Sequence, residues 1–346
     1  MKEKVTIYDI AKALNITAAT VSRALNNNPK ISEATRTLVI ETAKKMNYEQ
    51  NRFALALKSG KSNNVGVVVP FINRNFFSSI IRGIEEELYP KGYHVIICQT
   101  HEDTKKEEET VQNLLNAQVD GILMSVSKTT QQLRHFKKVL KSNTPLVFFD
   151  RIKEIDGVST VTIDDFQGGY IATKHLIDMG CTRIAHATVD LALDIYKYRF
   201  EGYKEALNDH GIPFKEEYII KTKSDIDAGE KAIKKLMKLK NAPDAIFSAS
   251  DFAALGAIQE LTKLGVKVPN EFAVVGFSNE PFTQFMELSI TTVDQSPVEM
   301  GKMAARVFLE QMKEPTLKIM KKVELSPELI VRKSSSSLTA KQQTNI

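Results

Sequence analysis

The sequence contains no tryptophan, only two cysteines and no long apolar run. Cys98 and Cys181 are too few for a disulfide framework and too far apart for a Cys-x-x-Cys site. No apolar stretch approaches the roughly 18 residues that a membrane-spanning helix needs. The N-terminal segment MKEKVTIYDIAKALN interrupts every apolar stretch with polar residues, so no secretory signal is expected. We therefore expect a protein of the reducing cytoplasm.

The signatures of common enzyme sites are also absent. The phosphate-binding GxxxxGK loop, the zinc-binding HExxH pattern, the nucleophile pattern GxSxG and the dinucleotide pattern GxGxxG do not occur. His94, Cys98 and His101 lie close in the sequence, but nothing nearby completes a tetrahedral metal site. We therefore expect no catalytic residue, no metal and no cofactor.

The charge of the chain is unevenly distributed. The 346 residues are 42% hydrophobic and 26% charged, which is typical of a soluble globular protein with two or more domains. Residues 1–61 contain 11 Lys and Arg against 5 Asp and Glu, a balance of +6, whereas the rest contains 36 against 37. A small basic segment on a neutral body favours contact with a polyanion, although a solvated basic terminus has the same composition.

The segment TIYDIAKALNITAATVSRALN (6–26) predicts two short helices. Its apolar residues recur at helical spacing in two groups, separated by Asn15, which tolerates the left-handed backbone that ends a helix. Thr17 offers its hydroxyl as the N-cap of the second helix. Ser32 is expected to cap a third helix, with Leu38, Val39, Ala43 and Met46 on its inward side.

Two short helices at a sharp angle form a helix-turn-helix, whose second helix can enter the major groove of DNA. The outer side of this second helix carries hydroxyl and amide side chains and one arginine, with no acidic residue. An ordinary amphipathic helical hairpin is the alternative.

Further segments make the chain recognisable. They are SEATR (32–36), NRFALALKSGKSNNVGVVVP (51–70), NFFSSIIRGIEEELYPKGYHVIIC (75–98), VDGILM (119–124), RFEGYKEAL (199–207), SDFAALGAIQ (250–259) and ITTVDQ (290–295). Together with the hairpin, they resemble the lac repressor family of bacterial transcription regulators. The resemblance extends to about residue 332.

The resemblance implies a fold and its boundaries. We expect a small all-α helix-turn-helix head, then an α/β core of the bilobed periplasmic-binding-protein type with two parallel doubly wound sheets. The expected segments are the head at 1–50, a hinge helix and linker at 51–61, the core at 62–332 and a disordered polar tail at 333–346. The first lobe would comprise 62–162 and 295–320, and the second 163–294 and 321–332, with chain crossings near Ile163, Gln295 and residue 320.

The resemblance also assigns DNA contacts. Ala18 and Ala19 would open the recognition helix and offer apolar contact to bases, whereas Arg23 would reach a guanine or a phosphate. Leu57 would wedge into the minor groove, unless it packs on the core as a linker leucine. The full expected set is Thr6, Tyr8, Thr17, Ala18, Ala19, Thr20, Ser22, Arg23, Asn26, Asn51, Ala54, Leu57 and Lys58.

From residue 65 onward, short apolar runs alternate with amphipathic segments, which predicts parallel sheets covered by helices on both faces. Ligands of such sheets bind beyond the carboxyl ends of the strands. The side chains at those ends, at the opening of the first helix of the core and at 199 form the expected effector site: Phe76, Phe77, Ser125, Asp150, Arg151, Arg199, Ser250, Asp251 and Ser278.

Carboxylates and an arginine that hold vicinal hydroxyls, with an aromatic ring beside them, suit a saccharide. Helix capping or an inter-lobe salt bridge is the alternative for Asp150 and Asp251, and lobe core is the alternative for Phe76 and Phe77. Ser278 replaces the aspartate found in many members of the family.

The function expected from these features is sequence-specific DNA binding by a transcription regulator, most simply a repressor of carbohydrate-utilisation genes. A sugar or sugar phosphate in the cleft would control the affinity of the protein for a pseudo-palindromic operator. The protein would bind this operator as a homodimer, without contact to a membrane. A cytoplasmic solute-binding protein and a sugar-processing enzyme on the same fold are the competing hypotheses. Strongly salt-dependent DNA binding would distinguish the regulator from both.

Overall fold

The computed structural model describes residues 5–49, 61–313 and 320–336. The contacts within the chain divide it into two compact units, one that ends at Ser62 and one that begins at Asn63. We call the first unit the head and the second the core, and describe each by itself.

The described residues of the head form three helices, α1 (Ile7–Leu14), α2 (Ala18–Leu25) and α3 (Glu33–Lys45). The predicted caps are confirmed: Asn15 is left-handed with φ of 50°, and the hydroxyls of Thr17 and Ser32 accept the backbone N–H groups of Thr20 and Thr35. The predicted inward position of Leu38 is wrong. Its side chain is 50% exposed, whereas Val39 and Ala43, also predicted to face inward, are buried.

The core of the head is small. The buried residues of its described part are Ile10, Ala11, Val21, Ala24, Val39 and Ala43, which come from α1, α2 and α3. Because so few side chains hold the three helices together, each of them carries a large share of the stability of the head.

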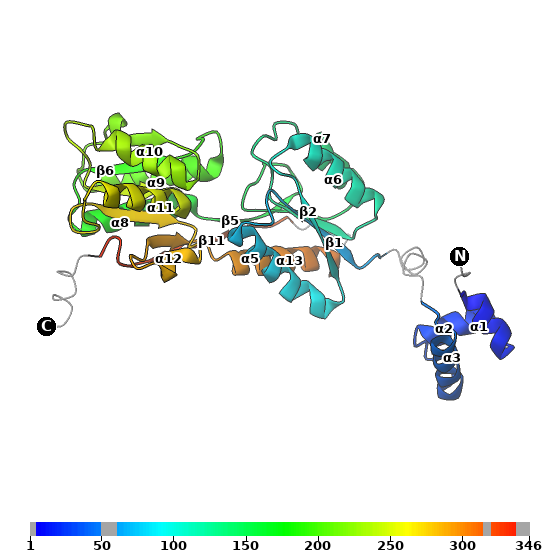
Figure 1. Ribbon diagram of the computed structural model, residues 1–346. Coiled ribbons are helices and arrows are strands. Elements are labelled where there is room, and N and C mark those ends of the chain that lie inside the picture. The colour runs from blue at the N-terminus through cyan, green and yellow to red at the C-terminus, as the bar shows by residue number, and fades with distance from the viewer. Residues whose placement is uncertain (1–4, 50–60, 314–319, 337–346) are drawn as a thin grey trace. The chain divides into compact units, whose positions relative to one another are not determined.

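The first lobe of the core is built on a six-stranded parallel sheet with the order β2-β1-β3-β4-β5-β11. The strands are β1 (Asn64–Val69), β2 (His94–Gln99), β3 (Gly121–Met124), β4 (Leu146–Phe149), β5 (Ser159–Ile163) and β11 (Lys322–Leu325). Helices α5 (Asn75–Leu88) and α13 (Pro297–Lys313) cover one face, and α6 (Thr104–Asn116) and α7 (Arg134–Lys141) cover the other (Figure 1). A short 3-10 helix, η1 (Tyr89–Lys91), follows α5.

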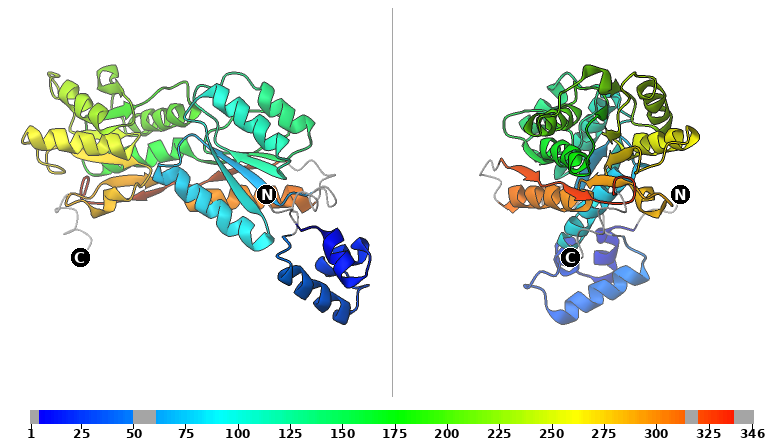
Figure 2. Two further views of the ribbon diagram at one scale, coloured as in Figure 1. Left: turned by 45° about the vertical axis from the view of Figure 1, so that its right-hand side comes forward. Right: turned by 90° about the vertical axis from the view of Figure 1, so that its left-hand side faces the viewer.

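The second lobe repeats this plan with the order β7-β6-β8-β9-β10-β12. The strands are β6 (Ile184–Thr188), β7 (Ile219–Lys221), β8 (Ala245–Ser248), β9 (Ala273–Phe277), β10 (Thr291–Asp294) and β12 (Glu328–Ile330), and only β12 is antiparallel to its neighbour. Helices α8 (Asp165–Asp178) and α9 (Asp194–Asp209) cover one face, whereas α10 (Ile226–Leu236) and α11 (Asp251–Lys263) cover the other (Figure 2). Two short helical segments, η2 (Glu216–Tyr218) and α12 (Phe282–Phe285), lie in its loops.

Two crossings between the lobes lie where they were predicted, after β5 and between β10 and α13. The third crossing was predicted near residue 320, and this is wrong. β11 at Lys322–Leu325 still pairs with β5, so the chain enters the second lobe between β11 and β12. Val323 and Leu325 pack against the apolar core of the first lobe, and this packing keeps the strand there.

The predicted disordered tail, 333–346, includes two residues that are packed in the second lobe. Ser334 and Ser335 are 0% and 2% exposed. The Ser334 hydroxyl donates to the carbonyl of Val274 and accepts from the amide of Thr291, so this serine joins the backbones of two segments of the second lobe. The other residues of the predicted tail, from 337 onward, lie outside the described residues. Within the described ranges, no helix is long and apolar enough to cross a membrane.

Candidate functional site

The second helix of the head presents the predicted DNA-binding side chains to solvent. Thr17, Ala19, Arg23 and Asn26 are exposed, and Ala18, Thr20 and Ser22 are half-buried. The hydroxyls of Thr17 and Thr20 lie 2.9 Å apart, and the Asn26 amide donates to the carbonyl of Ser22 over 2.7 Å. The buried side of the same helix holds Val21 and Ala24, which fix its orientation in the head.

Two more predicted contacts lie at the start of α1. Tyr8 is 72% exposed, so its ring is available to a partner. The amide and hydroxyl of Thr6 both donate to the Asp9 carboxylate, at 2.8 and 2.7 Å. These hydrogen bonds lower the pKa of Asp9 and complete the N-terminal turn. The predicted contacts Asn51, Ala54, Leu57 and Lys58 lie outside the described residues.

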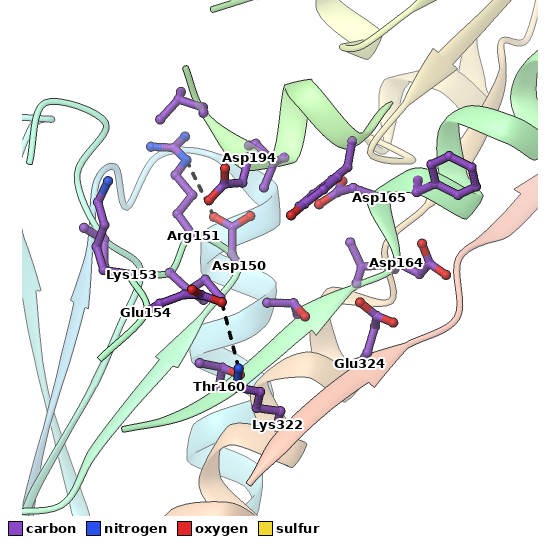
Figure 3. A pocket seen from close by; sticks show the side chains of 18 of the residues that line it. Asp150, Arg151, Lys153, Glu154, Thr160, Asp164, Asp165, Asp194, Lys322 and Glu324 are labelled. Carbon is purple, nitrogen blue, oxygen red and sulfur yellow. Dashed lines mark ion pairs between the residues drawn. The ribbon is translucent and has the colours of Figure 1, made fainter. Parts of the chain in front are cut away.

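A cavity of about 710 Å³ lies between the two lobes of the core (Figure 3). The first lobe lines it with residues that follow β3, β4 and β5 and with part of β5 and β11, and the second lobe lines it with the starts of α8 and α9. The polar residues of its wall are Ser127, Asp150, Arg151, Lys153, Glu154, Thr160, Thr162, Asp164, Asp165, Asp194, Tyr198, Lys322 and Glu324.

Asp150 and Arg151 are the two predicted effector residues that line the cavity directly. The Ser125 hydroxyl, also predicted, donates to Asp150 over 2.9 Å. Burial raises the pKa of Asp150, and the nearby Arg151 and Ser125 lower it in part. Arg151 directs its Nη1 to the carboxylate of Glu102 at 2.6 Å and lies 3.9 Å from Asp150 through Nε.

Arg199 lies behind the wall of the cavity rather than in it. Its Nε donates to Asp165 over 2.7 Å, its Nη1 to the carbonyl of Ala249 over 3.1 Å, and its Nη2 to Gln295 over 3.2 Å. The guanidinium is also stacked 3.6 Å from the centre of the Phe277 ring. Because Asp165 follows the first crossing and Gln295 lies within the second, Arg199 ties both crossing segments to α9.

Asp251 and Ser250 also lie away from the cavity. The Asp251 carboxylate accepts the Thr292 hydroxyl over 2.6 Å and the Glu280 amide over 2.8 Å, so it holds the loop after β9 to β10. Ser250 is buried at the start of α11, where its hydroxyl lies 3.5 Å from the carbonyl of Ser224. Both side chains have structural partners inside the second lobe.

Three predicted effector residues remain, namely Phe76, Phe77 and Ser278. Phe76 and Phe77 belong to the apolar core of the first lobe, with their rings 5.2 Å apart. The Ser278 hydroxyl accepts from Gln295 over 3.0 Å and therefore touches the hydrogen-bond network of Arg199. Asp150 and Ser278 both have positive φ, 60° and 119°, a conformation that costs about 1–3 kcal/mol and is concentrated at functional sites.

Several residues that line the cavity were not predicted from the sequence. Asp164 and Asp165 directly follow β5, so the rule that selected Asp150 from its strand end would have found them. Asp194 and Tyr198 are four positions apart and share one face of α9, but Arg199 lies on a different face, so spacing from Arg199 would not have indicated them. No local signal marks β11 as part of the wall, since it comes from the far end of the chain. In the described part of the chain, no group of three or more His, Cys, Asp or Glu is placed to hold a metal ion.

Comparison with known protein families identifies both units. Residues 6–51 match the model of bacterial regulatory proteins of the lacI family, and residues 62–326 match the periplasmic binding proteins and sugar-binding domain of the LacI family. The chain belongs to the LacI family. Its helix-turn-helix head and its two-sheet core are the two parts of that family's architecture.

Characterised members of the family resemble the chain over nearly its whole length. The HTH-type transcriptional regulator DegA of Bacillus subtilis (strain 168) is 34% identical over 97% of this chain and 99% of its own. Catabolite control protein A of Priestia megaterium is 33% identical over 90% of this chain and 94% of its own. The first of these relatives is a transcriptional regulator, and the second is a catabolite control protein.

Solved structures show the same fold. The lac repressor dimer bound to operator and the anti-inducer ONPF superposes with a TM-score of 0.85 at 22% identity, over 97% of this chain and 100% of that chain. The complex of the transcriptional regulator CelR with cellobiose superposes with a TM-score of 0.72 at 27% identity, over 96% and 100%.

The buried carboxylate of Asp251 makes the stability of this LacI-family core depend on pH. Burial raises its pKa to about 7, although the Thr292 and Glu280 hydrogen bonds lower it, and the nearby Glu280 and Arg332 act in opposite directions. In the unfolded chain the same group titrates near 3.9. Between about pH 4 and 7 the native state therefore holds a proton that the unfolded state has lost, and the free energy of unfolding falls as pH rises.

We expect Asp251→Asn to reduce this slope by up to about 1.4 kcal/mol per pH unit, because the amide cannot titrate. Asparagine can still accept the Glu280 amide and donate to the Thr292 oxygen. The measurement is denaturant unfolding of wild type and variant at pH 5, 6, 7 and 8, with the exposed Asp156→Asn as control. Equal slopes for all three proteins would show that Asp251 is ionised throughout.

Proposed function

We propose that this protein is a transcription regulator, most simply a repressor of carbohydrate-utilisation genes. Its homodimer would bind a pseudo-palindromic operator, and a small-molecule effector between the two lobes would control its operator affinity. The observation that carries the proposal is the combination, in one chain, of an exposed recognition helix without acidic residues and a cavity between two lobes.

The head supports DNA binding through shape and charge. Helix α2 has a short and flat outer side, because its exposed side chains are small apart from Arg23. Such a helix fits into the major groove, where methyl groups contact thymine and an arginine contacts guanine or phosphate. Thr6 and Tyr8 lie at the start of α1, the helix that crosses the DNA backbone in this motif.

The core supports control by an effector. The cavity lies among the segments that connect the lobes, so a ligand that contacts both walls favours one arrangement of the lobes over another. Two distinct sites and two states with different ligand affinity are the requirements of allostery. The CelR structure contains cellobiose, and a LacI-family regulator from Enterococcus faecium contains ribose, which favours a saccharide-like effector here.

The proposal predicts selective capture of genomic DNA. Purified full-length protein, incubated with genomic fragments at near-physiological salt, is expected to retain a few fragments that share an inverted repeat. The genes beside those fragments would then indicate the effector. Retention of random fragments, or of none, would contradict the regulator and favour a solute-binding role for the core.

Arg23→Ala is expected to weaken binding to a selected operator by about 5- to 150-fold, which corresponds to roughly 1–3 kcal/mol. The cause is loss of the exposed cation from the recognition helix. Fluorescence anisotropy across a salt series measures it, and Lys45→Ala at the end of α3 removes the same charge elsewhere on the head. Unchanged affinity in Arg23→Ala, or an equal loss in the control, would remove Arg23 from the interface.

A further inference from the structure

The ionisable side chains of the inter-lobe cavity have a large excess of negative charge. Its carboxylates are Asp150, Glu154, Asp164, Asp165, Asp194 and Glu324. Its cations are Arg151, Lys153 and Lys322. Figure 3 shows all nine side chains around one cavity, which therefore has three more carboxylates than cations.

Carboxylates already neutralise two of the three cations. Arg151 forms its short ion pair with Glu102, which lies outside the wall, and Lys322 lies 3.9 Å from Glu154. Two buried ion pairs join the wall to the groups behind it, Arg151–Glu102 and Arg199–Asp165. If the outer partners Glu102 and Arg199 are included, the excess remains three.

The deepest carboxylates are also the least compensated by solvent. Asp150 and Asp165 are 8% and 6% exposed, and they come from opposite lobes. Burial raises the pKa of Asp165 to about 6; the ion pair and hydrogen bond with Arg199 oppose this rise, and the charges of Asp150 and Asp164 add to it. Arg151 and Arg199 offset part of the charge of Asp150 and Asp165, but the two carboxylates still repel each other, and a positive ligand group would relieve the remaining repulsion.

The rest of the wall suits a hydroxylated ring. Ser127, Thr160, Thr162 and Tyr198 provide hydroxyl groups, which donate to and accept from the hydroxyls of a ligand. Tyr198 and Phe166 are 44% and 37% exposed and supply aromatic faces, which attract both sugar rings and cations.

We propose that the effector of this cavity is a polyhydroxylated amine, such as an amino sugar, and that the cavity excludes sugar phosphates. This inference rests on the proposed function, because it specifies the ligand of the same effector site. A protonated amine donates three hydrogen bonds and offsets one of the excess charges. A phosphate adds almost two negative charges to a wall that already carries three in excess.

The test uses matched ligands that differ in one substituent. Full-length protein is titrated calorimetrically, at low and at physiological salt, with glucose, glucosamine and glucose 6-phosphate. The corresponding galactose compounds, that is galactose, its amine and its phosphate, are titrated in the same way. Cellobiose is compared in the same way with the dimer of glucosamine. In at least one series we expect the amine to bind about tenfold or more tightly than its neutral parent, by charge attraction across a few ångströms. The phosphates are expected not to bind.

Two variants locate the effect in the cavity. Asp194 is exposed at the first residue of α9, so Asp194→Asn removes one charge from the wall without removing a buried partner. It is expected to weaken the amine severalfold more than it weakens the neutral parent. Asp156→Asn makes the same chemical change at an exposed loop position outside the cavity and is expected to alter neither.

The outcomes distinguish this inference from the proposed function. Tighter binding of a neutral sugar or a phosphate than of the matched amine would overturn the amine proposal and leave the regulator standing. If the protein selects operator fragments but binds none of the amines, the amine proposal would likewise be overturned and the regulator would stand. Failure to select any DNA would instead overturn the proposed function, whatever the cavity binds.

Discussion

Ile10→Ala is expected to abolish sequence-specific DNA binding while the core remains folded. Ile10 is 0% exposed and is the largest fully buried side chain of the head. Truncation of a buried isoleucine to alanine costs about 2–5 kcal/mol. At roughly 0.05–0.15 kcal/mol per residue, a head of this size has only about 2–7 kcal/mol of stability in total. The variant head is therefore largely unfolded and cannot present α2.

Two measurements check this expectation on the full-length protein. Operator affinity by fluorescence anisotropy should fall by two orders of magnitude or more, while the main thermal transition of the core stays at the wild-type temperature. Leu38→Ala is the matched control, because Leu38 is a similar side chain in the same unit but is half-exposed on α3. Wild-type affinity in Ile10→Ala would show that the head is stabilised by something besides its own core.

Arg199→Ala is expected to destabilise the core by about 3–5 kcal/mol, because it leaves the buried Asp165 without its ionic partner. The guanidinium also makes hydrogen bonds to Ala249 and Gln295, and both acceptors would lose a donor. By contrast, the ion pair of Arg183 and Asp244 is partly exposed, and Arg183→Ala is expected to cost roughly 1 kcal/mol or less.

A double-mutant cycle separates the ion pair from simple packing. Asp165→Asn removes the charge that Arg199 neutralises, so the loss in Arg199→Ala should be smaller in that background by about 1–3 kcal/mol. Denaturant unfolding of the four proteins gives the coupling energy. Additive losses would mean that Arg199 acts mainly by filling space above Phe277, and that the crossing segments do not depend on its charge.

Arg199 illustrates how far a family resemblance extends at the level of single residues. The resemblance placed Arg199 at the effector site, and the structure places it one layer behind, bonded to a residue of the wall. Asp150 and Arg151 line the cavity as expected, whereas Asp251 holds an internal loop. Asp150, Arg151 and Asp251 are alike in sequence as polar groups that follow strands, whereas Arg199 is the sixth residue of α9 rather than its first. What packs around each of them decides its contacts.

The features that the amino-acid order already specifies are local ones. The caps at Asn15, Thr17 and Ser32 depend on groups within three residues of one another, so a short window contains all the required information. The alternation of apolar runs and amphipathic segments likewise predicts parallel sheets with helices on both faces, because the apolar residues of each run indicate that its strand is buried.

The features that emerge only on folding depend on segments distant in the chain. β11 stays with the first lobe because Val323 and Leu325 pack there, and Ser334 joins the second lobe through partners 43 and 60 positions away. Leu38 is exposed although its spacing fits an inward face, whereas Val39 and Ala43 are buried in the packed head. The charge of the cavity is likewise contributed by the ends of separate strands and helices. The local sequence pattern predicts the secondary structure of a segment. Packing between segments that are distant in the chain determines which polar side chains are hydrogen-bonded inside the protein and which remain available to a ligand.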